Sequence, residues 1–150
     1  MFGGLDDNNL ATDRLICIKV ERQRYTNAVG LAGDPLLTVQ KLEPTGMPPP
    51  ARYMHSMTYV KGRAIITICG GRNDRLRNVV LGDLWVLRLD NLQYCKVKIA
   101  SEVQMTPRYN HTAAQFGTKL IIFGGFNKKM TLDMSAQEFE LDGPTVDLRI

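Results

Sequence analysis

Short apolar runs and pairs of glycines set the pattern of this chain. Residues 64–69 and 120–123 are continuous apolar or β-branched stretches, which is typical of strands that are buried on both faces. Three glycine pairs follow apolar residues: Gly3-Gly4, Gly70-Gly71 and Gly124-Gly125. At these pairs we expect a positive φ or a close backbone approach, because glycine has no Cβ to oppose either.

The polar and apolar positions around the second glycine pair predict four antiparallel strands at residues 57–60, 64–69, 83–89 and 94–99. A tight turn at 61–63 and two polar loops connect them. Trp85 lies in the third strand, where we expect it to be buried between sheets. The fourth strand alternates strictly, so that Tyr94, Lys96 and Lys98 should face solvent. Such a sheet needs a neighbour on each side, as a blade does in a β-propeller.

The same order of residues recurs in the last third of the chain. Arg52 and Arg108 are 56 residues apart (108 − 52), as are His55 and His111 (111 − 55). An ordered series at one period indicates an internal repeat. The chain resembles the kelch repeat, in which an apolar strand ends in Gly-Gly and a polar loop leads to an Asp-Leu-aromatic strand, here residues 83–85. The resemblance implies an all-β propeller built from four-stranded antiparallel blades of about 50 residues each.

The resemblance also divides the chain into three units. The first, residues 1–46, should be the outer half of one blade, with a long surface insertion at 21–36. The second, residues 47–101, should be a complete blade, and the third, residues 102–150, a blade whose outer strand lies at 145–150. About two and a half blades are fewer than the four that a propeller usually needs. We therefore expect an incomplete ring, with its missing blades in the same parent chain or supplied by self-association.

Composition adds a few constraints. Of the 150 residues, 44% are hydrophobic and 23% charged, as in an ordinary globular protein. No apolar run approaches the ~18 residues of a membrane span, and the first residues do not resemble a signal peptide, so we expect no membrane association. Cys17, Cys69 and Cys95 are scattered without CxxC spacing, which favours reduced, buried thiols in a cytoplasmic protein. With two histidines and no cysteine cluster, we expect neither a metal nor a cofactor.

Because successive turns of a meander alternate between the two ends of a sheet, the loops after the glycine pairs should share one face. The tight turns and the 21–36 insertion should lie on the opposite face. The residues predicted to bind a partner on the first face are Arg52, Arg72, Asn73, Arg75, Arg77, Arg108, Asn127, Lys128 and Lys129. The resemblance implies that kelch propellers bind partners on such a loop face. Arginine clusters suit carboxylates and phosphates, so the expected partner is a protein with an acidic or phosphorylated segment.

A structural role is the alternative for the residues that recur with the unit. Arg52 and Arg108 could connect one blade to the next instead of binding a ligand. His55 and His111 are expected to hydrogen-bond backbone groups near the inner strands. The predicted structural residues of the repeat are Gly3, Gly4, Gly70, Gly71, Gly124, Gly125, His55, His111 and Trp85.

The expected function is that of a scaffold for protein–protein interaction, as an adaptor or regulatory domain of a larger protein. The chain has no GxSxG, HExxH or P-loop motif, so no residue is predicted to be catalytic. The net charge of +4 is mild and no aromatic residue lies among the basic loop residues, which argues against nucleic-acid binding. The resemblance leaves one alternative open: a propeller domain of an enzyme, either the regulatory half of a kelch-containing Ser/Thr phosphatase or an oxidase- or isomerase-type propeller.

Overall fold

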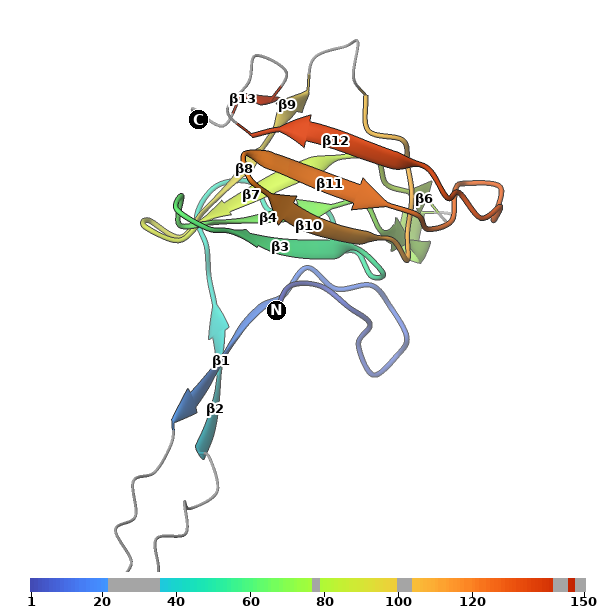
Figure 1. Ribbon diagram of the computed structural model, residues 1–150. Coiled ribbons are helices and arrows are strands. Elements are labelled where there is room, and N and C mark those ends of the chain that lie inside the picture. Colours follow the sequence, from blue (N-terminus) through green and yellow to red (C-terminus); the bar gives the residue numbers. More distant parts are fainter. Residues whose placement is uncertain (22–35, 77–78, 100–103, 142–145, 148–150) are drawn as a thin grey trace, which may run out of the picture.

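All strand pairs in the structure are antiparallel, as the meander pattern predicts. The structure is a computed structural model, which describes residues 1–21, 36–76, 79–99, 104–141 and 146–147. In this part of the chain the strands form several small sheets and no closed barrel (Figure 1). The all-β propeller segment expected from the sequence is therefore confirmed.

The central sheet is the four-stranded blade of the second unit. Its strands, in order, are β3 (Ser56–Val60), β4 (Ile65–Cys69), β7 (Leu84–Arg88) and β8 (Gln93–Lys96). The turn between β3 and β4 contains Gly62 at a φ of 88°, a conformation that glycine adopts readily. The isoleucines of β4 suit a central strand that is packed on both faces. The first three strands lie within one residue of their predicted bounds.

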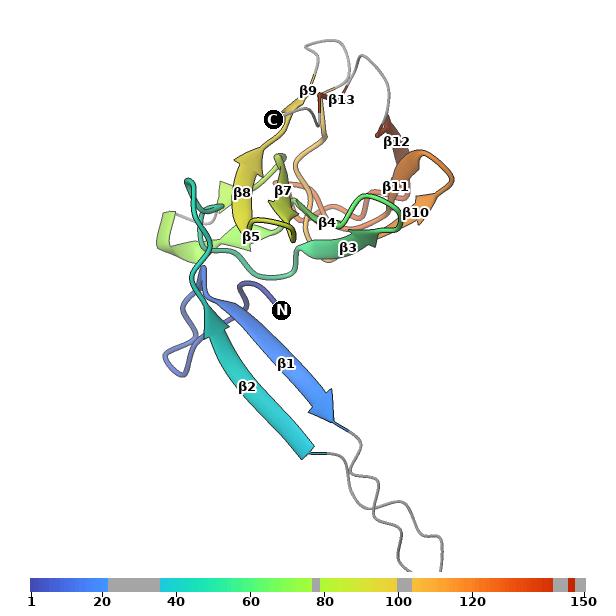
Figure 2. The same ribbon diagram turned by 90° about the vertical axis from the view of Figure 1, so that its left-hand side faces the viewer.

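The other two units contribute smaller sheets. The third unit supplies β10 (Thr112–Phe116), β11 (Lys119–Phe123) and β12 (Ala136–Glu140), which pair in that order. The first unit supplies a hairpin of β1 (Leu15–Glu21) and β2 (Leu36–Leu42), which extends away from the other sheets (Figure 2). The loop after Gly71 contains β5 (Arg72–Asn73), the short η1 (Asp74–Leu76) and β6 (Val79–Val80).

The two faces of the central sheet are buried against different units. Side chains alternate along β7, so Leu84 and Val86 point to one face and Trp85 and Leu87 to the other. Their cluster partners are Leu120, Ile122 and Phe139 of the third unit on the first face, and Phe2 and Leu15 of the first unit on the second. Full burial of one such side chain contributes about 1.5–3 kcal/mol. These two clusters therefore hold the units face to face, like neighbouring blades.

The glycine pairs adopt the backbone conformation expected of them. φ is positive at all six glycines and ranges from 56° at Gly70 to 100° at Gly4. Space is also short at Gly70, where an added Cβ would lie 2.6 Å from the backbone oxygen of Arg108. At Gly124 an added Cβ would meet only an ordinary contact at 3.7 Å, so the φ of 70° is the constraint there. Glycine is thus required at Gly70 for two reasons and at Gly124 for one.

The end of the chain departs from the predicted pattern. The strand expected at 145–150 should have been the outer strand of the third blade, but β13 (Val146–Asp147) pairs with β9 (Lys98–Ile99) of the second unit. β9 follows β8 after Val97, and in the described residues no other strand pairs with it. Its unpaired backbone groups therefore provide an edge for β13. In the described residues the third-unit sheet has three strands, and β12 is one of its edges.

Two side chains lie in environments opposite to those predicted. Tyr94 should face solvent but is only 5% exposed, because Phe2 packs against its ring with 5.8 Å between the ring centroids. Cys17 should be buried but is exposed, because its hairpin stands apart from the other sheets. Cys69 and Cys95 are buried as expected, and all three thiols are free.

Candidate functional site

Three loops, one from each unit, lie on the same side of the molecule (Figure 1). Each follows a glycine pair, at residues 5–11, 72–81 and 126–132. The connections into the second and third units pair with these loops through single bridges at Tyr53 and Tyr109. We call this surface the loop face, and it comprises the described residues of the three loops together with Tyr53, Met54, Tyr109 and Asn110. Arg77 and residues 22–35 of the insertion lie outside the described residues.

Arg52 lies beneath the loop face and is fully buried, with 0% exposure. Its guanidinium donates to both carboxylate oxygens of Asp83, at 2.7 and 2.9 Å, and to the backbone oxygens of Gly70 and Pro50. Burial alone would raise the pKa of Asp83, but hydrogen bonds from Arg52 and Trp85 and the charge of Arg52 hold it below its ordinary value. Arg52 therefore ties the connection between units to the strands of the second unit.

Arg108 repeats this arrangement in the third unit. It is also fully buried, and it donates to the backbone oxygen of Gly124 at 2.9 Å and to the Asp133 carboxylate at 3.3 Å. The Ser135 hydroxyl accepts a further hydrogen bond at 3.2 Å. The N–H groups of both guanidiniums donate to oxygens of this chain, so both arginines stabilise the connections between units, which is the structural role considered above as the alternative to ligand binding. Neither guanidinium is exposed to a ligand on the loop face.

Asn73 and Asn127 shape their loops from within. The side-chain oxygen of Asn127 accepts hydrogen bonds from the backbone N–H groups of Lys129 and Thr131, at 2.9 and 3.2 Å. The side-chain oxygen of Asn73 accepts one from the backbone N–H of Arg75 at 2.9 Å. Such contacts are typical of Asx turns. Both side chains therefore serve their own loops, and Asn73 is only 3% exposed.

Arg72 connects the second and third units across the loop face. Its guanidinium carbon lies 5.6 Å from the ring centroid of Tyr53 and 5.1 Å from that of Tyr109, which is the range of a cation–π contact. The same guanidinium donates to Asp74 at 3.1 and 2.9 Å. The Tyr53 hydroxyl also donates to Asp74. This cluster fixes the position of the second loop relative to the third unit.

The remaining predicted residues are basic and exposed. The Arg75 side chain is 49% exposed and lies 3.5 Å from the carboxylate of Asp6 in the first loop. Lys128 and Lys129 are exposed and form no ion pair with the residues that the structure describes. The structure thus brings predicted cations from two loops to one surface, next to the loop that carries Asp6.

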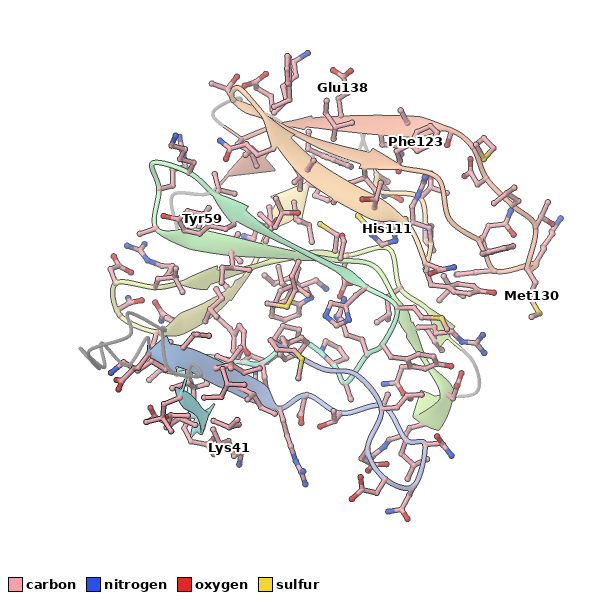
Figure 3. The ribbon with its side chains drawn as sticks, turned by 60° about the horizontal axis from the view of Figure 1, so that its bottom comes forward. Lys41, Tyr59, His111, Phe123, Met130 and Glu138 are labelled. Carbon is pink, nitrogen blue, oxygen red and sulfur yellow. The ribbon has the colours of Figure 1, made fainter. Side chains whose placement is uncertain are left out.

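Exposed apolar side chains, which were not predicted from the sequence, accompany these cations. Leu5, Met54 and Met130 are 47%, 49% and 70% exposed. Met130 lies at the tip of the third loop (Figure 3) and has a φ of 58°, a conformation that glycine or asparagine adopts more readily. Asn9 has the matching place in the first loop, also with a φ of 58°. An apolar residue at the turn position of a charged loop is the signal that could have identified Met130.

His55 and His111 occupy matching positions near the inner strands. Nε2 of His111 lies 2.9 Å from the Ser56 hydroxyl, so a side chain is its hydrogen-bond partner and not the predicted backbone group. Nδ1 of each ring is buried and has no hydrogen-bond partner among the described residues. Burial, followed by the charge of Arg52 or Arg108, lowers the pKa of each histidine to about 4.

Acid should therefore destabilise the protein. The pKa of an unfolded histidine is near 6.5, and the folded value is about 4 for both rings, so the unfolded state binds more protons between these values. We expect the free energy of unfolding to fall as pH decreases from about 6.5 to about 4, by roughly 1–2 kcal/mol for each partly buried histidine. Urea unfolding at a series of pH values measures this slope. If the free energy of unfolding of a folded His55→Gln, His111→Gln variant depends on pH as strongly as that of the wild type, the two histidines are not the cause of the acid sensitivity.

The described residues contain few features that point to another kind of site. Among them, no three His, Cys, Asp or Glu side chains are placed so that they could hold a metal ion. Nor does any helix in this part of the chain have the length and apolar character needed to cross a membrane.

Comparison with known proteins identifies the repeat. The family model of the KLHDC2/KLHL20/DRC7 Kelch-repeats domain matches residues 1–143. The chain is 35% identical over 95 residues to the Rho GTPase-activating protein gacHH of Dictyostelium discoideum, and this alignment covers 61% of the chain and 6% of that protein. It is 30% identical over 103 residues to the host cell factor homolog hcf-1 of Caenorhabditis elegans, and this alignment covers 65% of the chain and 13% of that protein. It is 35% identical over 106 residues to the tRNA wybutosine-synthesizing protein 2/3/4 of Oryza sativa subsp. japonica, and this alignment covers 71% of the chain and 9% of that protein.

The chain therefore spans at most 13% of the length of these three relatives. The family match extends from the first glycine pair into the third unit and includes the repeated arginines and histidines. Domains of this family are generally protein-interaction modules. The chain belongs to the kelch-repeat family of β-propeller proteins.

Proposed function

We propose that this chain is an adaptor or regulatory interaction module whose loop face binds an acidic or phosphorylated segment of a partner protein. The observation that carries the proposal is the group of exposed cations, Arg75, Lys128 and Lys129, on one surface with exposed Met130. Cations of this kind bind carboxylates and phosphates, and adjacent apolar side chains exclude water from such contacts.

The buried residues support this surface without contacting the partner. Arg52 and Arg108 fix the connections beneath it, and Arg72 fixes the second loop against two tyrosine rings. A surface whose loops are already held in place loses less conformational entropy on binding. Rigid support therefore favours recognition of a short segment, which must itself become ordered.

The relatives favour a role as one part of a larger protein. Their names include a GTPase-activating protein and a tRNA wybutosine-synthesizing protein, so a similar segment accompanies different activities. A segment that occurs in proteins with different activities is better explained by a role in recognition or regulation than by a role in catalysing one particular reaction. We therefore propose that the binding surface, and not a reaction centre, is what this chain contributes.

Charge reversal on the loop face should weaken binding. The probe is a fluorescein-labelled, glutamate-rich peptide with one Leu-Phe pair, and a second version carries two phosphoserines. In the Lys128→Glu, Lys129→Glu variant we expect the affinity measured by fluorescence anisotropy to fall at least tenfold, about 1.4 kcal/mol. Folding should be unaffected, because exposed charges contribute little to stability.

The matched control is Lys19→Glu, Lys61→Glu, which changes the net charge equally but away from the loop face. Lys19 lies on β1 and Lys61 in the tight turn after β3. The control should bind both peptides like the wild type. If the control loses affinity as much as the loop-face variant does, only the overall charge attracts the peptides. If the wild type binds neither peptide, the proposed partner chemistry is wrong.

A further inference from the structure

A cleft of about 390 Å³ lies between the second and third units. Its apolar lining includes Leu84 and Val97 of the second unit and Met105 of the third. The cleft extends to the loop face, because Leu81 of the second loop and Lys128 of the third loop also line it. The units on both sides of the cleft belong to this chain, so the cleft is not an end face of the segment.

Two cations line the cleft, Lys96 and Lys128. Both are exposed, and neither forms an ion pair with the residues that the structure describes. The Nζ atom of Lys96 lies 5.8 Å from the ring centroid of Trp85, which is the range of a cation–π contact. The acidic residue in the lining, Asp83, accepts hydrogen bonds at both carboxylate oxygens from the buried guanidinium of Arg52. The charge of Asp83 is thus compensated within the fold, and the cleft presents positive charge beside its apolar lining.

A smaller cleft, of about 230 Å³, occupies the matching place between the first and second units. The strand register gives the match. Lys41 pairs with Ile16, the second residue of β1, just as Lys96 pairs with Trp85, the second residue of β7. In the smaller cleft Lys41 forms an ion pair with Glu43, which lines the same cleft. The chain therefore compensates the lysine of one cleft and leaves the equivalent lysine of the other without an acidic partner among the described residues.

We infer that the cleft between the second and third units receives an apolar side chain of the partner segment, and that Lys96 and Lys128 bind an acidic or phosphorylated residue next to it. The inference rests on the proposed function and adds to it the place where the segment is anchored. Charge complementarity favours this occupant, because a carboxylate or phosphate supplies the charge that the lining lacks. An apolar side chain that fills the cleft excludes water from these contacts, as anchoring residues do in interfaces.

Charge reversal at Lys96 tests the cationic part of the cleft. In fluorescence anisotropy, the glutamate-rich peptide with its Leu-Phe pair should bind the Lys96→Glu variant about tenfold more weakly than the wild type. Lys41→Glu is the matched control, because it makes the same change of charge in the matching cleft, and it should bind within about twofold of the wild type. Urea unfolding verifies that both variants are folded. Equal losses of affinity in the two variants would mean that only overall charge attracts the peptide, and the inference would be wrong.

Filling the cleft tests its apolar part. Gln104 is exposed and lines the cleft, so the tryptophan of a Gln104→Trp variant should occupy it. A second peptide has Ser-Ser in place of Leu-Phe, and it should bind the wild type about tenfold more weakly than the first. The two peptides should bind Gln104→Trp with equal affinity, because the cleft is no longer open to either. If the Ser-Ser replacement weakens binding to Gln104→Trp as much as to the wild type, the apolar pair binds outside the cleft and the inference is overturned.

The same titrations separate this inference from the proposed function. A wild type that binds neither the glutamate-rich peptide nor its phosphorylated version overturns both. If the Lys128→Glu, Lys129→Glu variant loses affinity and Lys96→Glu does not, the loop face still binds the peptide, but the cleft does not anchor it.

Discussion

Replacing Arg52 with alanine is expected to destabilise the fold by about 3–5 kcal/mol. The substitution leaves the carboxylate of Asp83, whose side chain is only 18% exposed, without the two hydrogen bonds it accepts from Arg52. The backbone oxygen of Gly70 loses a buried donor as well. The connection into the second unit would then keep only its backbone contacts and the contacts of Tyr53 with Arg72 and Asp74. Urea unfolding followed by tryptophan fluorescence measures the loss.

Arg75→Ala is the matched control, because it removes an arginine of the same loop region that is half exposed. Its contact with Asp6 is 3.5 Å long and lies at the surface, so we expect a change within about 0.5 kcal/mol. Comparable losses in the two variants would mean that burial of the Arg52–Asp83 pair is not what stabilises the fold. A loss below about 1 kcal/mol for Arg52→Ala would contradict its structural role.

Replacing Trp85 with alanine should destabilise the fold by about 3–5 kcal/mol. The indole is 4% exposed and packs in the cluster that joins the central sheet to Phe2 and Leu15. Its Nε1–H also donates to Asp83 at 2.6 Å. Alanine would therefore remove both a contact between units and one hydrogen bond of the buried ion pair. Thermal unfolding by circular dichroism reports the shift.

Trp85→Phe separates these two contributions. Phenylalanine keeps most of the apolar contact and removes only the hydrogen bond to Asp83, so we expect a loss of about 1–2 kcal/mol. Equal losses in the two variants would show that packing between the units contributes little. A solvent-like fluorescence maximum of folded wild-type protein would show that Trp85 is not buried.

The repeating part of the fold could be predicted from the sequence because each signal is local. Gly70 and Gly124 end apolar runs and take the positive φ that only glycine adopts without strain. β4 follows directly from a continuous apolar run, and β3 and β7 follow from the apolar positions and turn residues on either side of it. The period of the repeat then indicates that these sheets pack against one another. Local pattern and repeat together were enough to specify the propeller segment.

What could not be predicted depends on neighbours that are distant in sequence. Tyr94 is buried because Phe2 packs on it, and β13 pairs with β9 because that edge has no other strand partner in the described residues. In the candidate site, Lys128 and Lys129 are exposed as expected. Arg52, by contrast, resembles a ligand-binding residue until Asp83 is seen 31 positions away. An arginine's charge alone does not show whether its partner is a ligand or the protein itself.

Binding of a partner across the loop face can be mapped by amide chemical shifts of the isotope-labelled chain, titrated with the glutamate-rich peptide. The proposal predicts that shifts concentrate at residues 5–11, 72–81 and 126–132 and at Tyr53 and Tyr109, while β1 and β2 are unaffected. Shifts confined to β1, β2 and residues 22–35 would contradict it and would place binding on the hairpin and the insertion.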